Sequence, residues 1–416
     1  MKRIAVSLAA LLSLAFLAAD WPQFRGPRGS AVSTETGLPT TWSASENIVW
    51  KTKLPGHGTS SPVVIGKRVY LTCYSGYGLD GSDPGDQSKL TRHVLSVNLA
   101  NGKIAWQKGV KADQGEEPFQ GFQALHGYAS STPAADGKGV YVFFGKSGVF
   151  AFDLKGKQLW RGDVGQGTHN WGSATSPLLY KELVIVNASV ESGAIVALNK
   201  KNGKEAWRAE GSQSSWNTPI LVDVGGKQEL VVSVQGTIGG FDPDNGKPLW
   251  RCDGIPDYVC PSLVAKDGVV YAIGGRSAMC LAIKAGGRGD VTKSHLLWQA
   301  QAGSNVTSPV IHEGHLYWVS DEGVAHCLKA DSGQIVYQER LDAERVYASA
   351  VAADGKLYIV SREDGAFVLD AAPRFKLLAH NDLSPDTSVF NAGPAVVNGQ
   401  LLLRSDQMLY CIGEKK

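Results

Sequence analysis

A hairpin pattern that ends in tryptophan recurs along this chain and constrains its fold more than any other feature. In the copy that runs from Ala194 to Trp207, an apolar segment enters an Asn-Gly turn and the return segment carries the aromatic residue. The turn glycine supplies the positive φ that a tight hairpin needs. We expect the tryptophans at this point of the pattern to be buried structural residues; they are Trp50, Trp106, Trp160, Trp207, Trp250 and Trp298.

A second pattern, a Ser-Pro or Thr-Pro pair or a variant of it followed by two short apolar strands, precedes each hairpin. It occurs eight times: Ser61-Pro62, Thr132-Pro133, Ser176-Pro177, Thr218-Pro219, Cys260-Pro261, Ser308-Pro309, Ser349-Ala350 and Gly393-Pro394. From Pro133 onward the spacing is 41 to 48 residues, the length of a four-stranded blade. The 49 glycines and three methionines also favour an all-β chain with many turns. The sequence predicts an all-β, eight-bladed β-propeller of four-stranded antiparallel blades.

The two ends of the chain are expected to close this ring. Only seven hairpins follow the eight starts, because the chain ends soon after Cys411. The missing outer strand is available upstream, between Asn47 and Lys53, where Trp50 has no hairpin before it. Pairing of the N- and C-terminal strands would leave no exposed edge along the ring. We therefore expect the propeller to span 47–413, with a tail at 414–416.

The N-terminus has the pattern of a secretory signal peptide. Two basic residues precede an apolar stretch that ends at Ala19, and the sequence turns polar at Asp20. We expect a signal peptide at 1–19, an extension at 20–46, and a soluble protein in the periplasm or outside the cell. A retained membrane anchor is the alternative, although the apolar run is shorter than the roughly 20 residues that a spanning helix needs. No cysteine follows the cleavage point to carry a lipid.

Charge gives no reason to expect nucleic acid as a partner. Removal of Lys2 and Arg3 from the 41 basic residues leaves 39, which equals the 39 acidic residues. A neutral chain exerts no bulk attraction on nucleic acid or on anionic lipid.

The recurring Asp-x-x-x-Gly-Lys-x-x-Trp pattern resembles the repeat of the PQQ-like β-propeller family. The opening from Trp21 to Pro27 is similar to that of exported PQQ-binding-like propeller repeat proteins. The family includes quinoprotein dehydrogenases, which use PQQ with calcium, and scaffolds such as the propeller lipoprotein of the outer-membrane β-barrel assembly machine. The resemblance implies a WD40-like or quinoprotein-like propeller fold and leaves both kinds of function open.

The motifs of the dehydrogenases are missing from this sequence. It has no adjacent cysteine pair, which forms a ring disulfide against the quinone in the enzymes that it resembles, and no Cys-x-x-Cys-His haem motif. The common hydrolase, metalloprotease and phosphate-loop motifs are also absent. The leading hypothesis is a non-catalytic binding or scaffold propeller of the cell envelope without a cofactor. The alternative is an atypical PQQ-dependent sugar or alcohol dehydrogenase that holds PQQ with Ca²⁺.

Two of the six cysteines are candidates for a disulfide. Cys252 and Cys260 bracket the step between two blades, and an oxidising location would permit a bond between them. Cys280, Cys327 and Cys411 occupy a repeat position that otherwise holds small residues, which predicts buried thiols.

A ligand is expected at one face of the ring. The loops into the innermost strands and the loops between the middle strands open there around the central channel. Aromatic, amide, imidazole and guanidinium groups gather in these loops and suit a peptide segment of an envelope protein, a glycan or a small ligand. The alternative is that these side chains cap turns and hold channel water. The candidates are His57, His126, Tyr128, His169, Asn170, Trp171, Trp216, Asn217, Asp257, Tyr258, Asn305, Arg345, Tyr347, Asn391, Arg276, Arg362 and Arg404.

Metal binding and self-association are not indicated by the sequence. The histidines His57, His126 and His169 lie on three consecutive blades without a short ligand spacing, so we expect no metal site. We expect a monomer.

Overall fold

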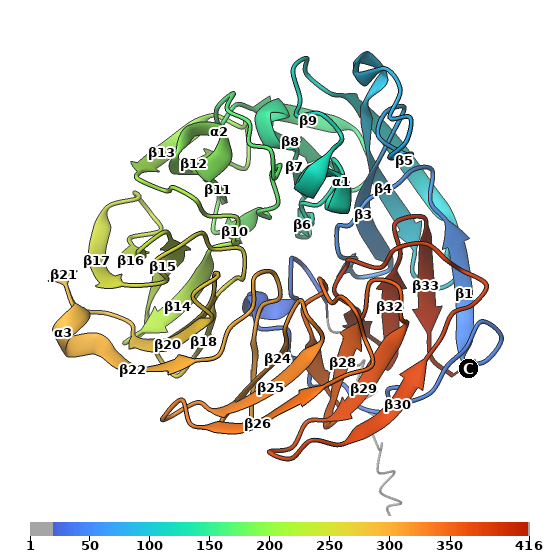
Figure 1. Cartoon of the computed structure of the whole chain (residues 1–416). Coiled ribbons are helices and arrows are strands. Elements are labelled where there is room, and N and C mark those ends of the chain that lie inside the picture. The colour runs from blue at the N-terminus through green and yellow to red at the C-terminus, as the bar shows by residue number, and fades with distance from the viewer. Residues whose placement is uncertain (1–19, 415–416) are drawn as a thin grey trace, which may run out of the picture.

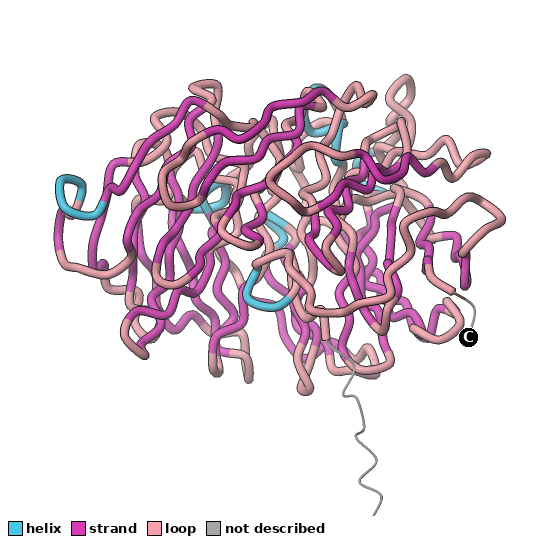
Figure 2. The backbone as a smooth tube through the Cα atoms, turned by 90° about the horizontal axis from the view of Figure 1, so that it is seen from below, coloured by secondary structure: helices cyan, strands magenta, loops and turns pink. Residues whose placement is uncertain are grey.

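Eight β-sheets surround a central channel in the computed structural model, which describes residues 20–414 (Figure 1). Figure 2 shows the ring edge-on, as a short cylinder. Each sheet runs outward from the channel in four antiparallel strands, and one sheet adds a short fifth strand at its outer edge; this arrangement confirms the predicted eight-bladed propeller. The predicted signal peptide at 1–19 lies outside the described residues, as do the last two residues of the tail.

The blades are numbered in chain order from the first inner strand. Blade 1 consists of β2 (Val63–Ile65), β3 (Arg68–Ser75), β4 (Thr91–Asn98) and β5 (Ile104–Lys111), and blade 2 of β6 (Ala134–Ala135), β7 (Val140–Phe143), β8 (Val149–Phe152) and β9 (Gln158–Gly162). Blade 3 consists of β10 (Leu178–Tyr180), β11 (Leu183–Ala188), β12 (Ala194–Asn199) and β13 (Glu205–Glu210), and blade 4 of β14 (Ile220–Val224), β15 (Lys227–Val234), β16 (Thr237–Phe241) and β17 (Pro248–Asp253).

Blade 5 consists of β18 (Val264–Lys266), β19 (Val269–Gly274), β20 (Met279–Lys284) and β22 (Leu296–Gln301), and blade 6 of β23 (Val310–His312), β24 (His315–Val319), β25 (Val324–Lys329) and β26 (Ile335–Arg340). Blade 7 consists of β27 (Val351–Ala353), β28 (Lys356–Val360), β29 (Ala366–Asp370) and β30 (Leu377–Asn381), and blade 8 of β31 (Ala395–Val397), β32 (Gln400–Arg404), β33 (Met408–Ile412) and β1 (Ile48–Lys53). The helical segments are short: η1 (Pro27–Gly29), η2 (Gln87–Lys89), α1 (Gly121–His126), η3 (Gly145–Ser147), α2 (Ser189–Ser192) and α3 (Thr292–His295).

Blade 8 is built from both ends of the propeller, as the sequence predicted. Strand β1 pairs antiparallel with β33, and Trp50 lies opposite Cys411. The C-terminal part of the chain therefore supplies three strands of this blade and the N-terminal part supplies the outermost one.

The six predicted structural tryptophans lie between neighbouring blades. In five of them the indole nitrogen Nε1 donates to a backbone carbonyl in the outer turn of the following blade, as in Trp50 to Leu99 at 2.8 Å. The Trp50 ring covers Gly102, whose φ is 71°, and a Cβ atom there would lie 2.5 Å from the ring atom Cε3. Glycine is thus needed at the turn both for its backbone conformation and for the stacked ring.

Trp250 is the exception, because the outer turn of blade 5 is replaced by a longer excursion. Its Nε1 donates to the carboxylate of Glu229 in its own blade at 2.6 Å. The excursion carries β21 (Gly289–Asp290), which pairs parallel with β17 of blade 4, and α3. The long turn that the repeat pattern indicated therefore ties blade 5 to blade 4.

The extension at 20–46 begins as a strap across one end of the channel. Residues 20–33 of the extension are called the strap here. The strap includes the blue segment at the centre of the ring in Figure 1. The backbones of Trp21 and Val64 exchange two hydrogen bonds in blade 1, and Ala31 and Ser33 bond to Ala352 in blade 7. The Asp20 carboxylate accepts from the Gly66 amide in the turn that follows β2. Since the predicted mouth precedes the inner strands, the strap closes the opposite end of the channel.

The predicted disulfide between Cys252 and Cys260 is not formed, because all six cysteines are free thiols. Cys252 lies in β17 and is buried in the hydrophobic core between blades 4 and 5. Cys260 lies in the following loop and lines the central channel. The two side chains occupy different environments on either side of the blade step. Cys280, Cys327 and Cys411 are fully buried, as expected for packing residues.

Candidate functional site

A cavity of about 430 Å³ occupies the central channel at the predicted mouth. It is called the channel cavity here. Its wall comes from the loops that lead into the inner strands, because these loops converge on the ring axis. Eight of the predicted residues line it: His126, Trp171, Trp216, Tyr258, Arg276, Asn305, Tyr347 and Asn391.

An aromatic cluster forms one side of the channel cavity. It is named the aromatic rim and consists of Phe122, His169, Trp171, Trp216 and Tyr258. The Trp171 ring is central, with its centroid 4.9 Å from that of Trp216 and 4.6 Å from that of Tyr258. His169 lies 4.9 Å from Trp216, and Phe122 of α1 lies 5.1 Å from Trp171. Rings at these distances form a rigid, largely apolar surface with polar edges.

Polar groups continue the wall beside the aromatic rim. The Tyr258 hydroxyl donates to Asn305 Oδ1 at 3.0 Å, and Asn305 Nδ2 donates to Asp321 at 3.1 Å. The Arg276 guanidinium lies 5.5 Å from the centre of the Tyr258 ring. Burial raises the pKa of Tyr258, so its hydroxyl keeps its proton. The wall thus offers one cation and one carboxylate, both held near a fixed ring.

His126 is a positioning residue in this wall. Its Nε2 donates to the Trp171 carbonyl at 2.7 Å, and its Nδ1 contacts the Ser130 hydroxyl. Burial lowers the pKa of His126, which favours the neutral imidazole. Because the imidazole joins α1 to the Trp171 loop, it holds two sides of the aromatic rim together.

Deeper in the channel, seven blades each contribute one hydroxyl to a circle that is called the hydroxyl ring. Each hydroxyl oxygen except that of Ser61 accepts a backbone N–H from the preceding blade at 2.9 to 3.0 Å. In blade 5 this position is held by Ser262 and not by Cys260. Pro261 precedes the hydroxyl residue in this blade, whereas in blades 1 to 4 and 6 the proline follows the hydroxyl residue. The members are Ser61, Thr132, Ser176, Thr218, Ser262, Ser308 and Ser349.

The strap closes the channel cavity from the far end with Phe24, which the sequence did not single out. The extension shares no repeat with the blades, so no periodic signal could align Phe24 with the channel. Phe122 and Leu125 were also missed. They come from α1, a short helix inside an insertion that interrupts the repeat.

Three predicted mouth residues are buried structural groups instead. Tyr128 packs in a cluster with Tyr74 and Tyr77, and its hydroxyl donates to the Glu117 carbonyl at 2.6 Å. Asn217 is fully buried and its amide donates to the Ser215 hydroxyl at 2.8 Å.

The third such residue is Arg404, which lies between blades 8 and 1. Its Nη1 donates to the Ser60 carbonyl at 2.8 Å. Burial lowers the pKa of Arg404 to about 10, so the guanidinium remains charged at neutral pH. Its position at the strand end directs the side chain sideways into the blade interface.

The remaining candidates lie at the rim of the mouth or behind its wall. His57 Nδ1 is 3.4 Å from the Asp406 carboxylate. Arg362 donates to Asn391 at 2.7 Å and lies 4.7 Å from the centre of the Tyr347 ring, so it supports two wall residues from behind. The Asp257 carboxylate accepts from the Ser277 amide at 2.9 Å and caps a turn. The exposed ones are His169, Asn170 and Arg345.

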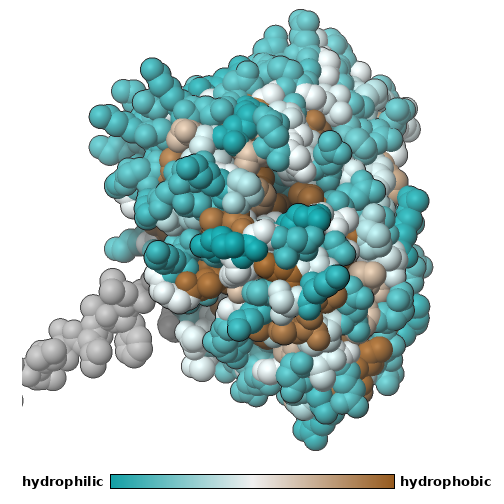
Figure 3. All heavy atoms as spheres, turned by 90° about the vertical axis from the view of Figure 1, so that its left-hand side faces the viewer, coloured by the Kyte–Doolittle hydropathy of each residue, from teal (hydrophilic) through white to brown (hydrophobic). Residues whose placement is uncertain are grey.

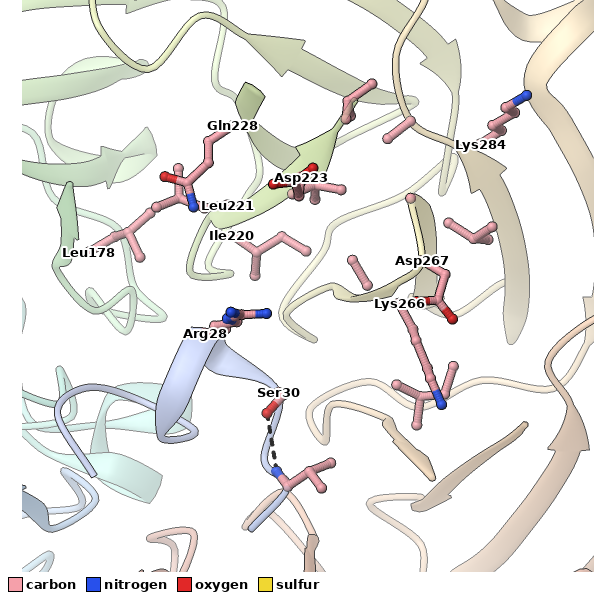
Figure 4. A pocket seen from close by; sticks show the side chains of 18 of the residues that line it. Arg28, Ser30, Leu178, Ile220, Leu221, Asp223, Gln228, Lys266, Asp267 and Lys284 are labelled. Atoms are coloured by element: carbon pink, nitrogen blue, oxygen red, sulfur yellow. Dashed lines mark hydrogen bonds between the residues drawn. The ribbon is translucent and has the colours of Figure 1, made fainter. Parts of the chain in front are cut away.

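A wider hollow of about 1180 Å³ lies on the strap side of the ring (Figure 4). Leu178, Ile220 and Leu221 line one part of it, and Lys266 and Asp267 lie on the other side. The exposed Arg28 of the strap projects beside them. This hollow is larger than the channel cavity, but no Phe, Tyr or Trp lines it, and its charged side chains are exposed. We therefore regard the channel cavity as the site for an organic ligand.

A quinone held by calcium does not fit the residues of the channel cavity. Among residues 20–414, no three His, Cys, Asp or Glu side chains gather closely enough to hold a metal ion. The single lining carboxylate near the aromatic rim, Asp321, already accepts hydrogen bonds from Asn305. We derive no catalytic step through such a cofactor. In the same part of the chain, no helix is both long and apolar enough to cross a bilayer.

Comparisons with known proteins agree with this architecture. An outer membrane protein assembly factor BamB of Burkholderia pseudomallei (strain K96243) is 23% identical over 361 residues, which cover 75% of this chain and 84% of the relative. A tetrathionate hydrolase of Acidithiobacillus ferrooxidans is 21% identical over 378 residues, covering 80% of this chain and 67% of that enzyme. The crystal structure of BamB from Moraxella catarrhalis matches with a TM-score of 0.61 at 12% identity, covering 88% of this chain and 99% of that chain, and shows the fold alone.

A family model described as outer membrane protein assembly factor BamB matches residues 26–170, 92–338 and 234–407. The three matches overlap, and together they cover nearly all of the blades. The chain therefore belongs to the PQQ-like β-propeller family that this model describes.

Proposed function

We propose that this protein is a non-catalytic binding or scaffold propeller of the bacterial cell envelope, and that it holds a peptide segment of a partner protein in the channel cavity. The observation that carries the proposal is the aromatic rim at the open end of a channel whose other end is closed by the strap. A cavity with one rigid aromatic side and Phe24 of the strap at its far end suits the capture of a projecting chain segment. The volume of about 430 Å³ lies within the roughly 300–1,000 Å³ of ligand pockets.

The chemistry of the wall favours a peptide. A peptide presents both apolar side chains and backbone amide and carbonyl groups, and buried backbone groups need hydrogen-bond partners. The aromatic rim would accept an apolar or aromatic side chain, while the amides of Asn305 and Asn391 and the hydroxyl ring would face the backbone. Relatives that are named as assembly factors for outer membrane proteins also support a protein or peptide as the ligand. A glycan or a small ligand would use the same groups and is the outcome that the experiment below distinguishes.

We further propose export of the chain with cleavage after Ala19, and a monomeric state. In support of the cleavage point, Asp20 is held to the propeller, because its carboxylate accepts from the Gly66 amide. In support of a monomer, the side of the ring in Figure 3 is largely hydrophilic, with hydrophobic residues confined to a limited area near its middle. Leu159 and Leu297 are about half exposed, and scattered apolar residues of this kind are normal on a monomer.

The proposal is tested by placing a photoreactive amino acid at Phe122 in the exported protein. Phe122 is 52% exposed beside Trp171, and Leu159, 49% exposed on the outer strand β9, is the matched control position. We expect a defined protein adduct from position 122, its loss in the Trp171→Ala background, and none from position 159. Adducts that form equally at both positions, or that persist without Trp171, contradict the proposal. An adduct with a glycan instead of a protein would assign the site to the other ligand class.

A further inference from the structure

The strap buries an arginine whose charge is not balanced by the residues around it. Arg25 is only 4% exposed, and its Nη2 donates to the Pro309 carbonyl of blade 6. Its Nε and Nη1 are buried and have no hydrogen-bond partner within residues 20–414. No carboxylate in this part of the chain forms an ion pair with Arg25. Burial lowers the pKa of Arg25 to about 9, so the guanidinium still carries its charge at neutral pH.

A small space lies beside this guanidinium. It has a volume of about 10 Å³, and its lining includes Arg25, Gly29, Thr218, Ile220 and Ser262. A space of this size holds one particle the size of a water molecule and excludes a carboxylate or phosphate group. It lies below the hydroxyl ring, on the strap side of the channel cavity.

Two hydroxyls that border this space have protons available to donate. The Thr218 oxygen accepts the Ser176 amide at 3.0 Å, and the Ser262 oxygen accepts the Thr218 amide at 2.9 Å. Each hydroxyl therefore uses a lone pair within the ring, and neither donates to another residue of the described chain. The residues that line this space thus carry two guanidinium nitrogens without a partner in the described chain and two hydroxyls with a proton free to donate.

We propose that this space is a binding site for one monatomic anion, with chloride as its ligand, held between the Arg25 guanidinium and the hydroxyls of Thr218 and Ser262. The Arg25 guanidinium can only donate, and the hydroxyls of Thr218 and Ser262 have protons free to donate, which selects an anion over a cation. A buried charge that lacks a counter-ion is strongly unfavourable, which selects chloride over a neutral water molecule. The small volume selects a single atom over a polyatomic anion. The ion would fasten the strap to blades 4 and 5 and so keep the lower end of the channel closed.

The test measures the melting temperature of the full exported chain at constant ionic strength while chloride or bromide replaces gluconate. We expect a saturable rise with either halide. Arg25→Gln should abolish the saturable rise, whereas Arg28→Gln, three residues along the same strap and exposed, should retain it. A wild-type melting temperature that does not depend on the halide overturns the proposal.

A second pair of variants separates loss of the ion from loss of the ring. Ser262→Ala and Ser308→Ala each remove one inter-blade hydrogen bond of the hydroxyl ring, but only Ser262 borders the space. Removal of one charge-assisted donor should weaken the apparent halide affinity of Ser262→Ala about tenfold or more, with no change in Ser308→Ala. Equal weakening in both variants contradicts the site.

Crystals of the wild-type protein grown with bromide provide a test that does not depend on how the variants fold. We expect an anomalous peak between Arg25 and Ser262. The lack of a peak there in bromide-grown crystals overturns the proposal, whatever the melting data show.

Discussion

Replacing Trp207 by alanine removes a side chain that joins blade 3 to blade 4, and the loss of stability can be worked out from its contacts. The indole is 7% exposed, covers Gly246 and donates to the Pro243 carbonyl at 3.1 Å. A buried tryptophan removes roughly 150–250 Å² from water, which at about 25 cal/mol per Å² gives an upper bound of about 4–6 kcal/mol. Truncations of large buried aromatics measure about 3–5 kcal/mol, and we expect Trp207→Ala to fall in that range.

The assay is equilibrium denaturation in guanidinium chloride, followed by circular dichroism and checked by calorimetry. With an unfolding entropy of about 2.1 cal/mol/K per residue, a ring of about 400 residues that unfolds as one unit should lose roughly 4–6 °C in Tm. Trp207→Phe keeps most of the ring area but not the Nε1 hydrogen bond, so it should lose only about 1–2 kcal/mol. Trp171→Ala, a partly exposed tryptophan in the channel cavity, is the matched control, with an expected loss below about 1 kcal/mol. A loss below about 1 kcal/mol for Trp207→Ala would refute the docking argument.

Three further predictions concern the site and its surroundings. Trp171→Ala combined with Tyr258→Ala should abolish the photo-adduct at the mouth with little change in Tm, whereas Asn217→Ala should destabilise the fold by about 1–3 kcal/mol because its partners are left unpaired. Burial raises the pKa of Glu191 to about 7, so the folded state holds this proton more tightly than the unfolded state does. The stability of the fold should therefore fall as the pH rises from about 4.5 to 7. Glu191→Gln should flatten this slope when Tm is measured over that pH range. Addition of PQQ and Ca²⁺ to the purified protein should give no dye reduction with sugars or alcohols, and stoichiometric quinone binding with turnover would contradict the scaffold proposal.

The fold could be predicted from the sequence because the propeller repeats its own signals. The Asn-Gly turn and Trp207 mark the outer hairpin of blade 3, and similar segments mark the outer hairpins of other blades. A degenerate copy can therefore be assigned from the copies on either side of it. The ring closure through Trp50 and Cys411 followed from counting strands. Blade 5 shows the limit of this reasoning, because Pro261 is displaced by two residues and the sequence pattern placed Cys260 where the structure has Ser262.

The channel cavity was only partly predictable, since alignment gives a position along the chain and not the direction of a side chain. Trp171 and Tyr258 turn into the channel, whereas Asn217 turns into its own blade and Arg404 turns toward blade 1. Phe24 could not be found at all, because no repeat connects the extension to the blades. Local packing at each loop decides these directions, and a single sequence does not encode it as a pattern.

The pairing of β1 with β33 also fixes when the molecule can become complete. The strand that is synthesised first in the propeller has its partner at residues 408–412, so blade 8 cannot form until the other seven blades have been synthesised. Closing so long a loop is entropically unfavourable and slow compared with forming the local hairpins of the other blades. A chain that stops short of β33 would leave both β1 and β32 with an unpaired edge. The exposed backbone N–H and C=O groups of these edges would distinguish the incomplete propeller for chaperones and proteases. The last strand of the propeller to be synthesised is thus the one that completes the ring.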